Sequence, residues 1–144
     1  MKFSGKNVLI TGASRGIGAS IAENLAGMGL KVWINYRSDP APADELKAKI
    51  ESSGAVAALI KFDASNESGW SEAIKLITES DGELSYLVNN AGITNDKLAL
   101  RMSESDFTSV IDANLKSAFL FHWYQSKKEL LGTLMPCALV MHIG

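Results

Sequence analysis

Three glycines near the N-terminus stand at a spacing that could hold a phosphate group. The segment Thr11-Gly12-Ala13-Ser14-Arg15-Gly16-Ile17-Gly18 separates a short apolar run, residues 7–10, from a stretch with helical periodicity. A tight turn needs positive φ, and backbone close to a pyrophosphate leaves no room for a Cβ. The following helix would offer free N–H groups and a positive dipole end. This context favours a nucleotide site over a ligand-free turn. The predicted contacts are Gly12, Ser14, Arg15, Gly16, Ile17 and Gly18.

The end of the next apolar run, Lys31 to Tyr36, indicates which nucleotide binds. A dinucleotide without a 2′-phosphate is usually held by an Asp or Glu near the end of that strand. Here Arg37 follows the strand, and Arg15 lies inside the turn. Guanidinium groups bind phosphate as planar forks, so we predict NADPH rather than NADH. The alternatives are a solvated Arg37 and a ribose contact from Asp39, which lies beyond the expected strand end.

Two further strand ends carry residues suited to the same ligand. Asp63 and Ala64 end the predicted strand 55–62, and Asn89-Asn90-Ala91-Gly92 ends the predicted strand 84–89. Doubly wound sheets bind ligands at these carboxyl ends. Ala91 and Gly92 would let a cofactor approach the backbone, and Asn90 could tie neighbouring strand ends together. The alternatives are that Asp63 only begins a turn or caps the next helix, and that an Asn-Gly-type turn explains part of the second motif.

These residues are positioned by apolar runs that alternate with helical stripes. A helix is predicted after the glycine turn, another after Pro40 and Pro42, and a third ending at Asp81-Gly82. Ser103 and Asp106 resemble a capping box. It opens a helix with the apolar stripe Phe107, Val110, Ile111, Leu115, Ala118 and Phe119. The last apolar run, residues 137–143, predicts a fifth strand. This order predicts an α/β fold, a Rossmann-like doubly wound parallel sheet that ends after the fifth strand, in a single domain over residues 1–144.

Both motifs resemble those of the short-chain dehydrogenase/reductase family, T-G-x-x-x-G-x-G at residues 11–18 and N-N-A-G at residues 89–92. Residues 89–119, NNAGITNDKLALRMSESDFTSVIDANLKSAF, further resemble the 3-oxoacyl-[acyl-carrier-protein] reductases of fatty acid synthesis. The resemblance covers residues 1 to about 120. It implies NADPH-dependent reduction of a 3-oxoacyl thioester on acyl-carrier protein, and a hydrogen bond from Asp63 to the adenine region. Short-chain reductases of sugars, acetoacetyl thioesters or polyketides share much of this half.

Asn114 follows Ile111 by three residues and precedes Ala118 by four, which predicts that it lies on the buried face of its helix. A buried amide costs free energy unless it is paired. One interpretation is a helix–sheet hydrogen bond. The other, implied by the resemblance, is the family's catalytic Asn, which holds a water in the proton relay.

The resemblance also implies a catalytic Ser, a Tyr and a Lys four residues after that Tyr, all beyond the fifth strand. These 144 residues carry none of the three at those positions, so we expect negligible turnover from them. Tyr124 and Lys128 have the Tyr-x-x-x-Lys spacing, but they come soon after Asn114 on the same predicted helix. From that helix the phenol of Tyr124 could not reach the edge of the sheet at which the strands end. We interpret them as a solvated helix end.

Residues 121–144 depart from the family pattern. Four rings follow one another at residues 121–124, and residues 130–143 are almost uncharged. We hypothesise that this tail is read from a shifted frame, or that the chain is a degenerate fragment. Family members assemble as homo-tetramers through late helices and the last strand, so the oligomeric state is left open.

The amino-acid composition excludes several classes of protein. The 144 residues carry 14 Lys and Arg against 16 Asp and Glu, a net charge of −2, with 47% hydrophobic residues. This excludes a disordered chain and a basic nucleic-acid module. We find no secretory signal and no apolar stretch of the about 18 residues a membrane helix needs. The lone Cys137 and the isolated His122 and His142 predict no metal site. We expect a cytoplasmic protein. The rival hypotheses are a nucleotide-binding module without catalysis and an aggregating remnant with an uncovered sheet edge.

Overall fold

Four short apolar runs form one parallel sheet. The computed structural model describes residues 6–129, and its strands are β1 (Asn7–Ile10), β2 (Lys31–Tyr36), β3 (Ala57–Lys61) and β4 (Tyr86–Val88). They lie in the order β3-β2-β1-β4. The predicted α/β class with a doubly wound parallel sheet is confirmed. Strands β3 and β4 are shorter than the predicted runs 55–62 and 84–89, because the residues at their ends bend into loops. The predicted strand 137–143 lies outside the described residues.

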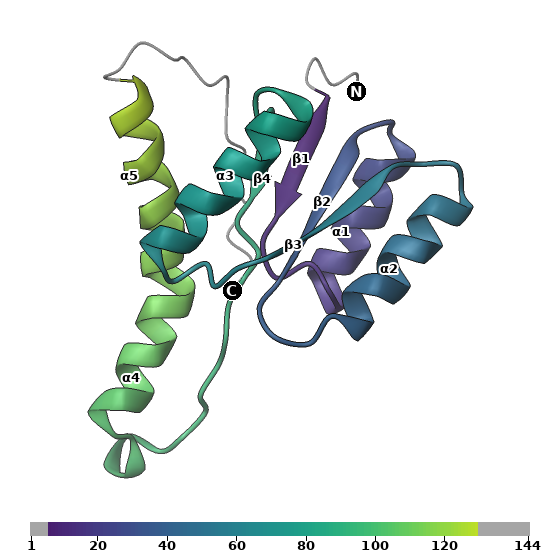
Figure 1. The fold of residues 1–144 in the computed structure, drawn as a ribbon. Coiled ribbons are helices and arrows are strands. Elements are labelled where there is room, and N and C mark those ends of the chain that lie inside the picture. The colour runs from purple at the N-terminus through teal and green to yellow at the C-terminus, as the bar shows by residue number, and fades with distance from the viewer. Residues whose placement is uncertain (1–5, 130–144) are drawn as a thin grey trace.

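The helices cover both faces of the sheet. Two pack on one face and the others lie on the opposite side (Figure 1). The first face carries α1 (Gly16–Gly27) and α2 (Ala41–Ser52), and the second carries α3 (Glu67–Asp81) and α5 (Ser117–Glu129). Before α5 come the 3-10 turn η1 (Ala99–Arg101), α4 (Glu104–Ile111) and the π-helical segment η2 (Asp112–Lys116). Pro42 lies in the first turn of α2, where its missing N–H leaves no helical bond unmade.

The strands contribute side chains to two hydrophobic cores, one on each face, because successive side chains of a strand point to opposite faces of a sheet. Val8 and Ile10 of β1 pack with α1 and α2, whereas Leu9 packs with α3 and α5. All three side chains are fully buried. Continuous burial on both faces explains why the strands read as apolar runs rather than as alternating patterns.

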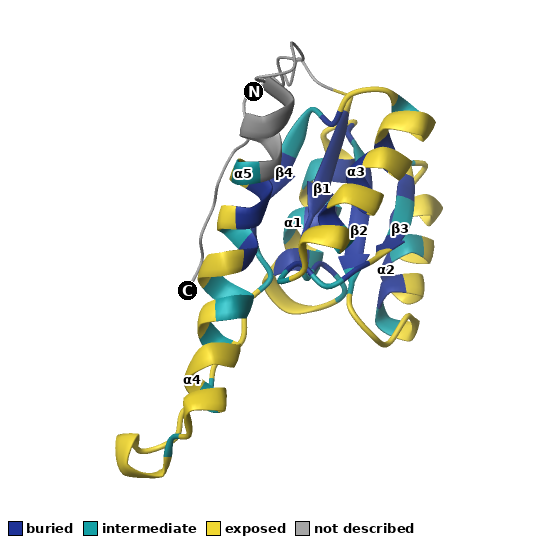
Figure 2. Cartoon of the chain, turned by 60° about the vertical axis from the view of Figure 1, so that its left-hand side comes forward, coloured by how far each residue is buried: buried dark blue, intermediate teal, exposed yellow. Residues whose placement is uncertain are grey.

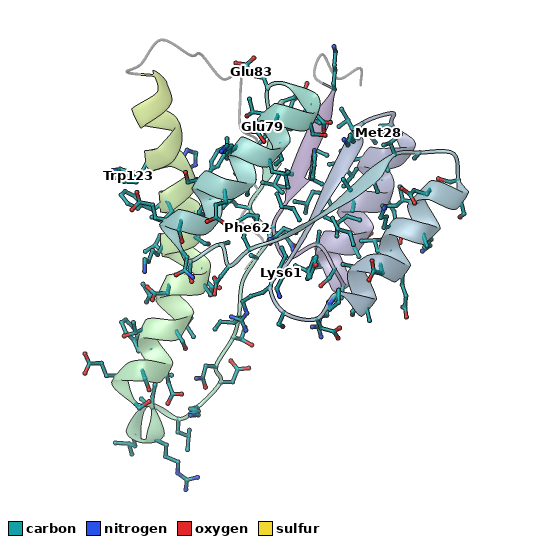
Figure 3. All side chains as sticks on the ribbon, viewed as in Figure 1. Met28, Lys61, Phe62, Glu79, Glu83 and Trp123 are labelled. Atoms are coloured by element: carbon teal, nitrogen blue, oxygen red, sulfur yellow. The ribbon has the colours of Figure 1, made fainter. Side chains whose placement is uncertain are left out.

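Trp70 is the largest side chain of the second core. It is fully buried, and its indole N–H donates to the carbonyl of Ala64, 2.8 Å away. The ring lies 5.0 Å from Phe62 and 5.3 Å from Phe121, measured between centroids. Phe62 follows the last residue of β3, Lys61 (both labelled in Figure 3). Trp70 therefore joins α3, α5 and the loop that leaves β3.

A polar cluster fastens the end of α3 to the start of β2. The Asp81 carboxylate accepts from Lys31 Nζ at 2.5 Å and from the indole N–H of Trp33 at 2.7 Å. Burial opposes ionisation of Asp81, but hydrogen bonds from Lys31, Ser80 and Trp33 outweigh it and hold its pKa below the ordinary value.

Replacing Asp81 by Asn is expected to weaken the fold at neutral pH and to flatten its loss of stability in acid. Because the folded-state pKa is lowered, the unfolded chain takes up a proton first as pH falls. The stabilisation is complete above the ordinary Asp pKa of about 4 and is lost as the pH falls through the folded-state value. Urea denaturation at pH 7 and pH 3 measures both effects, with an expected cost of about 1–3 kcal/mol at pH 7. Asp96→Asn, in an exposed loop, is the control. An unchanged acid response in Asp81→Asn would contradict this role.

The apolar stripe of residues 107–119 runs along α4, η2 and the start of α5, called here the α4–η2–α5 rod. The helix face that carries this stripe and Asn114 was predicted to be buried, and that prediction is wrong. Phe107, Leu115 and Phe119 are 58%, 64% and 60% exposed, and α4 has no buried residue. Figure 2 shows α4 extending away from the four strands that the structure describes. Within this rod only α5 reaches the second core, through Leu120 and Phe121. Periodicity located the stripe, and among the described residues the position of the four strands decides which part of it is covered.

Candidate functional site

The carboxyl ends of all four strands of the described sheet open into one cleft of about 620 Å³. The loops after β1, β2, β3 and β4 each contribute to its wall. Eleven of the predicted site residues line it: Gly12, Ser14, Arg15, Ile17, Arg37, Asp63, Ala64, Asn90, Ala91, Gly92 and Asn114. Gly16 and Gly18 do not line the cleft. They shape the turn that does.

The glycine turn has the backbone form that its sequence predicts. Gly12 has φ +61°, and a Cβ there would lie 2.9 Å from Ala91 Cα. A Cβ on Gly18 would lie 2.7 Å from the carbonyl oxygen of Gly12. Helix α1 begins at Gly16 with no side-chain cap, so its first N–H groups have no capping acceptor. A turn of this kind is suited to an anionic ligand.

The loops after β1 and β4 are joined by Thr11 and Asn90. The Thr11 hydroxyl accepts from the backbone N–H groups of Asn90 and Ala91, both at 3.0 Å. Asn90 Nδ2 donates to the carbonyls of Thr11 and Gly12 at 3.0 and 3.1 Å. The prediction that Asn90 ties neighbouring strand ends together is confirmed.

Asn35 is a positioning residue that sequence reasoning missed. It is buried in β2, and its Oδ1 accepts from the N–H of Gly12 at 3.0 Å. Its Nδ2 donates to the carbonyl of Phe62 at 3.0 Å. One amide thus connects the glycine turn to the loop after β3. The available signal was a polar residue inside an otherwise apolar strand, because such a group needs partners when buried.

The loops after β1, β2 and β3 supply the charges. Arg15 and Arg37 line the cleft with exposed side chains. Asp39 also lines it, but its Oδ1 accepts from the N–H of Ala41 at 3.0 Å, at the start of α2. Burial opposes ionisation of Asp63, yet hydrogen bonds from Ser65 and the charges of Arg37 and Lys116 outweigh it and lower the pKa. Asp63 is therefore held as an anion chiefly by its hydrogen bonds from Ser65.

Asn114 does not occupy the buried helix face predicted for it. Its side chain is half-buried and binds the backbone of the loop after β4: Oδ1 accepts from Ile93 N–H at 2.8 Å, and Nδ2 donates to Ile93 O at 3.0 Å. The prediction assumed regular α-helical spacing. Asn114 lies in the π-helical segment, where the extra residue per turn changes the direction of the side chain.

Asp106 holds the same loop from the other side. Ser103 and Asp106 form the predicted capping box. Asp106 Oδ1 also accepts from Lys97 Nζ at 2.7 Å and from Asn95 Nδ2 at 2.9 Å. The hydrogen bond from Lys97, followed by those from Ser103 and Asn95, holds the Asp106 pKa well below its usual range. Asp106 therefore fixes the loop between β4 and α4 to the start of α4.

Further predictions concern metal ligands, membrane-spanning helices and the Tyr-x-x-x-Lys spacing. Within residues 6–129, no cluster of three or more His, Cys, Asp or Glu side chains could hold a metal ion. No helix in this part of the chain is long and apolar enough to cross a membrane. Tyr124 and Lys128 lie in α5, as predicted.

The chain is similar to known proteins in sequence and in structure. A family model described as short chain dehydrogenase matches residues 6–128. The 3-oxoacyl-[acyl-carrier-protein] reductase FabG of Staphylococcus epidermidis is 41% identical over 114 residues, 79% of this chain and 47% of that protein. The 3-oxoacyl-[acyl-carrier-protein] reductase of Synechocystis is 42% identical over 112 residues, 78% of this chain and 45% of that protein. The chain thus spans about half the length of these relatives.

Solved structures share the fold. A putative gluconate dehydrogenase from Agrobacterium tumefaciens superimposes with a TM-score of 0.80 at 35% identity, over 88% of this chain and 50% of that one. A double mutant of a Serratia marcescens short-chain dehydrogenase/reductase gives the same TM-score at 26% identity, over 88% of this chain and 52% of that one.

Proposed function

Because the chain belongs to the short-chain dehydrogenase family, we propose that its cleft binds NADPH for the reduction of a 3-oxoacyl thioester carried on acyl-carrier protein. The observation that carries the proposal is the cleft itself, where a glycine turn, an uncapped helix start and two arginines meet at the carboxyl ends of the strands. Doubly wound sheets bind dinucleotides at this edge. When bound, NADPH supplies a hydride to the 3-keto carbon.

Each part of the dinucleotide is assigned to a different set of residues around the cleft. The turn from Gly12 to Gly18 and the first N–H groups of α1 hold the pyrophosphate. Arg15 and Arg37 hold the 2′-phosphate, and Asp63 and Ala64 hold the adenine region. Asn90, Ala91 and Gly92 let the ligand approach the backbone after β4. Asp39 is less suited to a ribose, because one of its oxygens already binds the start of α2.

The substrate assignment is supported by the two reductases that share 41–42% identity with the chain. Asn114 is proposed as the Asn of the proton relay. In that role it holds a water, and its side-chain amide also fixes the loop after β4 through Ile93. A short-chain reductase of another carbonyl substrate is the alternative within the family.

A second candidate function is dinucleotide binding without reduction. It is favoured by the cleft lining among residues 6–129, which includes no lysine that could act beside a tyrosine. Titration with NADPH and an acetoacetyl-thioester reduction assay separate the candidates. We expect binding without measurable turnover from the 144 residues. Turnover would overturn the second candidate, and absence of NADPH binding would overturn both.

Arg37→Ala is expected to weaken NADPH binding by about 10- to 100-fold while leaving NADH binding unchanged, because charge-assisted hydrogen bonds contribute about 1.5–3 kcal/mol each. Nucleotide fluorescence titration measures both constants. Lys61→Ala is the control, since Lys61 is an exposed cation at the end of β3 that does not line the cleft. Equal losses for both nucleotides would contradict a 2′-phosphate contact.

The cellular location and the oligomeric state of the protein are proposed from the same family relationship. We assign it to the cytoplasm and expect a homo-oligomer. Four exposed apolar side chains of the α4–η2–α5 rod support self-association, because exposed large apolar side chains are often contact sites: Phe107, Ile111, Leu115 and Phe119.

A further inference from the structure

Gly92 is a glycine whose backbone conformation does not account for its residue type. Its φ lies outside the left-handed region that favours glycine, whereas Gly12 and Gly16 have φ of +61° and +59°. A side chain at residue 92 would therefore not be strained by φ. The space around the residue decides instead whether a side chain fits.

The space beside Gly92 is occupied by the side chain of Asn114. A Cβ on residue 92 would lie 2.9 Å from Asn114 Oδ1 and 3.7 Å from Asn114 Cγ. The next neighbour is the carbonyl oxygen of Asn90, at 4.0 Å, which is an ordinary contact. Because non-bonded heavy atoms prefer about 3.5–4.0 Å, the Asn114 amide would have to move if residue 92 had a side chain.

The same amide is bound to both backbone groups of the residue after Gly92. Asn114 Oδ1 accepts from Ile93 N–H at 2.8 Å, and Nδ2 donates to Ile93 O at 3.0 Å. Two bonds to one residue fix both the position and the plane of the amide. Asparagine has a short side chain, so a displaced Oδ1 could not keep this pair of bonds.

The contact joins two separate parts of the cleft wall. Gly92, Ile93 and Asn114 all line the cleft. Gly92 and Ile93 follow β4, whereas Asn114 lies in the π-helical segment η2. The direction of the Asn114 side chain at the cleft therefore depends on a residue of another loop.

We propose that Gly92 is a positioning residue for Asn114. Because residue 92 has no side chain, the Asn114 amide can lie against the loop after β4 and bind Ile93. The importance of this contact for reduction rests on the proposed function, in which Asn114 belongs to the proton relay. The contact itself needs no ligand, so it restricts residue 92 independently of any approach of a ligand to the backbone.

The test compares Gly92→Ala, Asn114→Ala and the double variant in the full 144-residue chain without nucleotide. Nuclear magnetic resonance measures hydrogen exchange of the Ile93 amide. We expect Gly92→Ala to accelerate this exchange about two- to tenfold, the range of one hydrogen bond. Asn114→Ala should accelerate it by a similar factor, because both changes take away the same acceptor.

The double variant shows whether the two residues act through one contact. With Asn114 already shortened, the methyl group at residue 92 has no amide to displace. We therefore expect the double variant to exchange no faster at Ile93 than Asn114→Ala, and to have a melting temperature no lower. Independent residues would instead give losses that add.

Gly69→Ala is the matched control. Gly69 lies in α3, also has φ outside the left-handed region, and a Cβ there would lie 3.1 Å from Asp63 O and 3.2 Å from Phe62 Cβ. Neither atom belongs to Asn114 or Ile93. We expect unchanged exchange at Ile93 and the same change in melting temperature with and without Asn114→Ala.

The proposal and the proposed function can fail separately. Exchange at Ile93 that is equal in Gly92→Ala and the parent would overturn the positioning role of Gly92, and so would additive losses in the double variant. NADPH titration of the parent is a separate measurement. Failure to bind NADPH would overturn the proposed function and the relay role of Asn114, while Gly92 would still position the Asn114 amide.

Discussion

Gly18→Val is expected to abolish dinucleotide binding and to destabilise the chain. A Cβ at this position would lie 2.7 Å from Gly12 O and 2.9 Å from Ala13 Cα, both backbone atoms, and would also meet Asn90 Nδ2. The turn must move, and it then loses its hydrogen bonds to Asn90. Loss of two charge-assisted hydrogen bonds to phosphate lowers affinity by more than about 100-fold. Overpacking costs about 1–3 kcal/mol of stability. Calorimetric NADPH titration and urea denaturation measure the two effects.

Gly27→Ala is the matched control in the same helix. Gly27 ends α1, and no atom outside its own helix and neighbours lies within 4 Å of a Cβ placed there. Alanine is a better helix former, so we expect a stability gain of about 0.4–1 kcal/mol and unchanged affinity. A Gly18→Val variant that bound NADPH as tightly as Gly27→Ala would contradict the close approach of α1 to the loop after β4.

Trp70→Ala is expected to cost about 3–5 kcal/mol of unfolding free energy, the range measured for large aromatic truncations in a core. Small domains have only about 5–15 kcal/mol in total, so this variant is near the limit of folding. The change removes two ring contacts, to Phe62 and Phe121, and leaves the carbonyl of Ala64 without its donor. Urea denaturation followed by far-ultraviolet circular dichroism measures the loss.

Trp70→Phe separates the ring from its N–H group. Phenylalanine retains most of the apolar surface but cannot donate to Ala64, so we expect about 1–3 kcal/mol of destabilisation. Because Ala64 lines the cleft, this variant should also weaken nucleotide binding. If Trp70→Ala cost no more than Trp70→Phe, the packing of α3 against α5 through Trp70 and Phe121 would be refuted.

Local chemistry explains which site residues could be predicted. Gly12 and Gly18 are required by the backbone itself, one by its φ and the other by close approach, so their residue type carries the information. Asn90 follows a buried strand and ties two strand ends together, a role that its position predicts. Asn35 was missed because its partners, Gly12 and Phe62, come from two separate loops.

The sequence by itself determined the order of strands and helices, the glycine turn and the edge of the sheet at which the cleft opens, because each depends on short-range periodicity, φ preference or parallel connection. Only the tertiary structure decided that the stripe of α4 stays exposed, that Asn114 turns to Ile93, and that its amide fills the space beside Gly92. These features depend on where the four described strands lie, on one π-helical turn and on which atoms meet across distant loops. Residue spacing along a chain does not encode such distances, since they arise when packing brings the elements together.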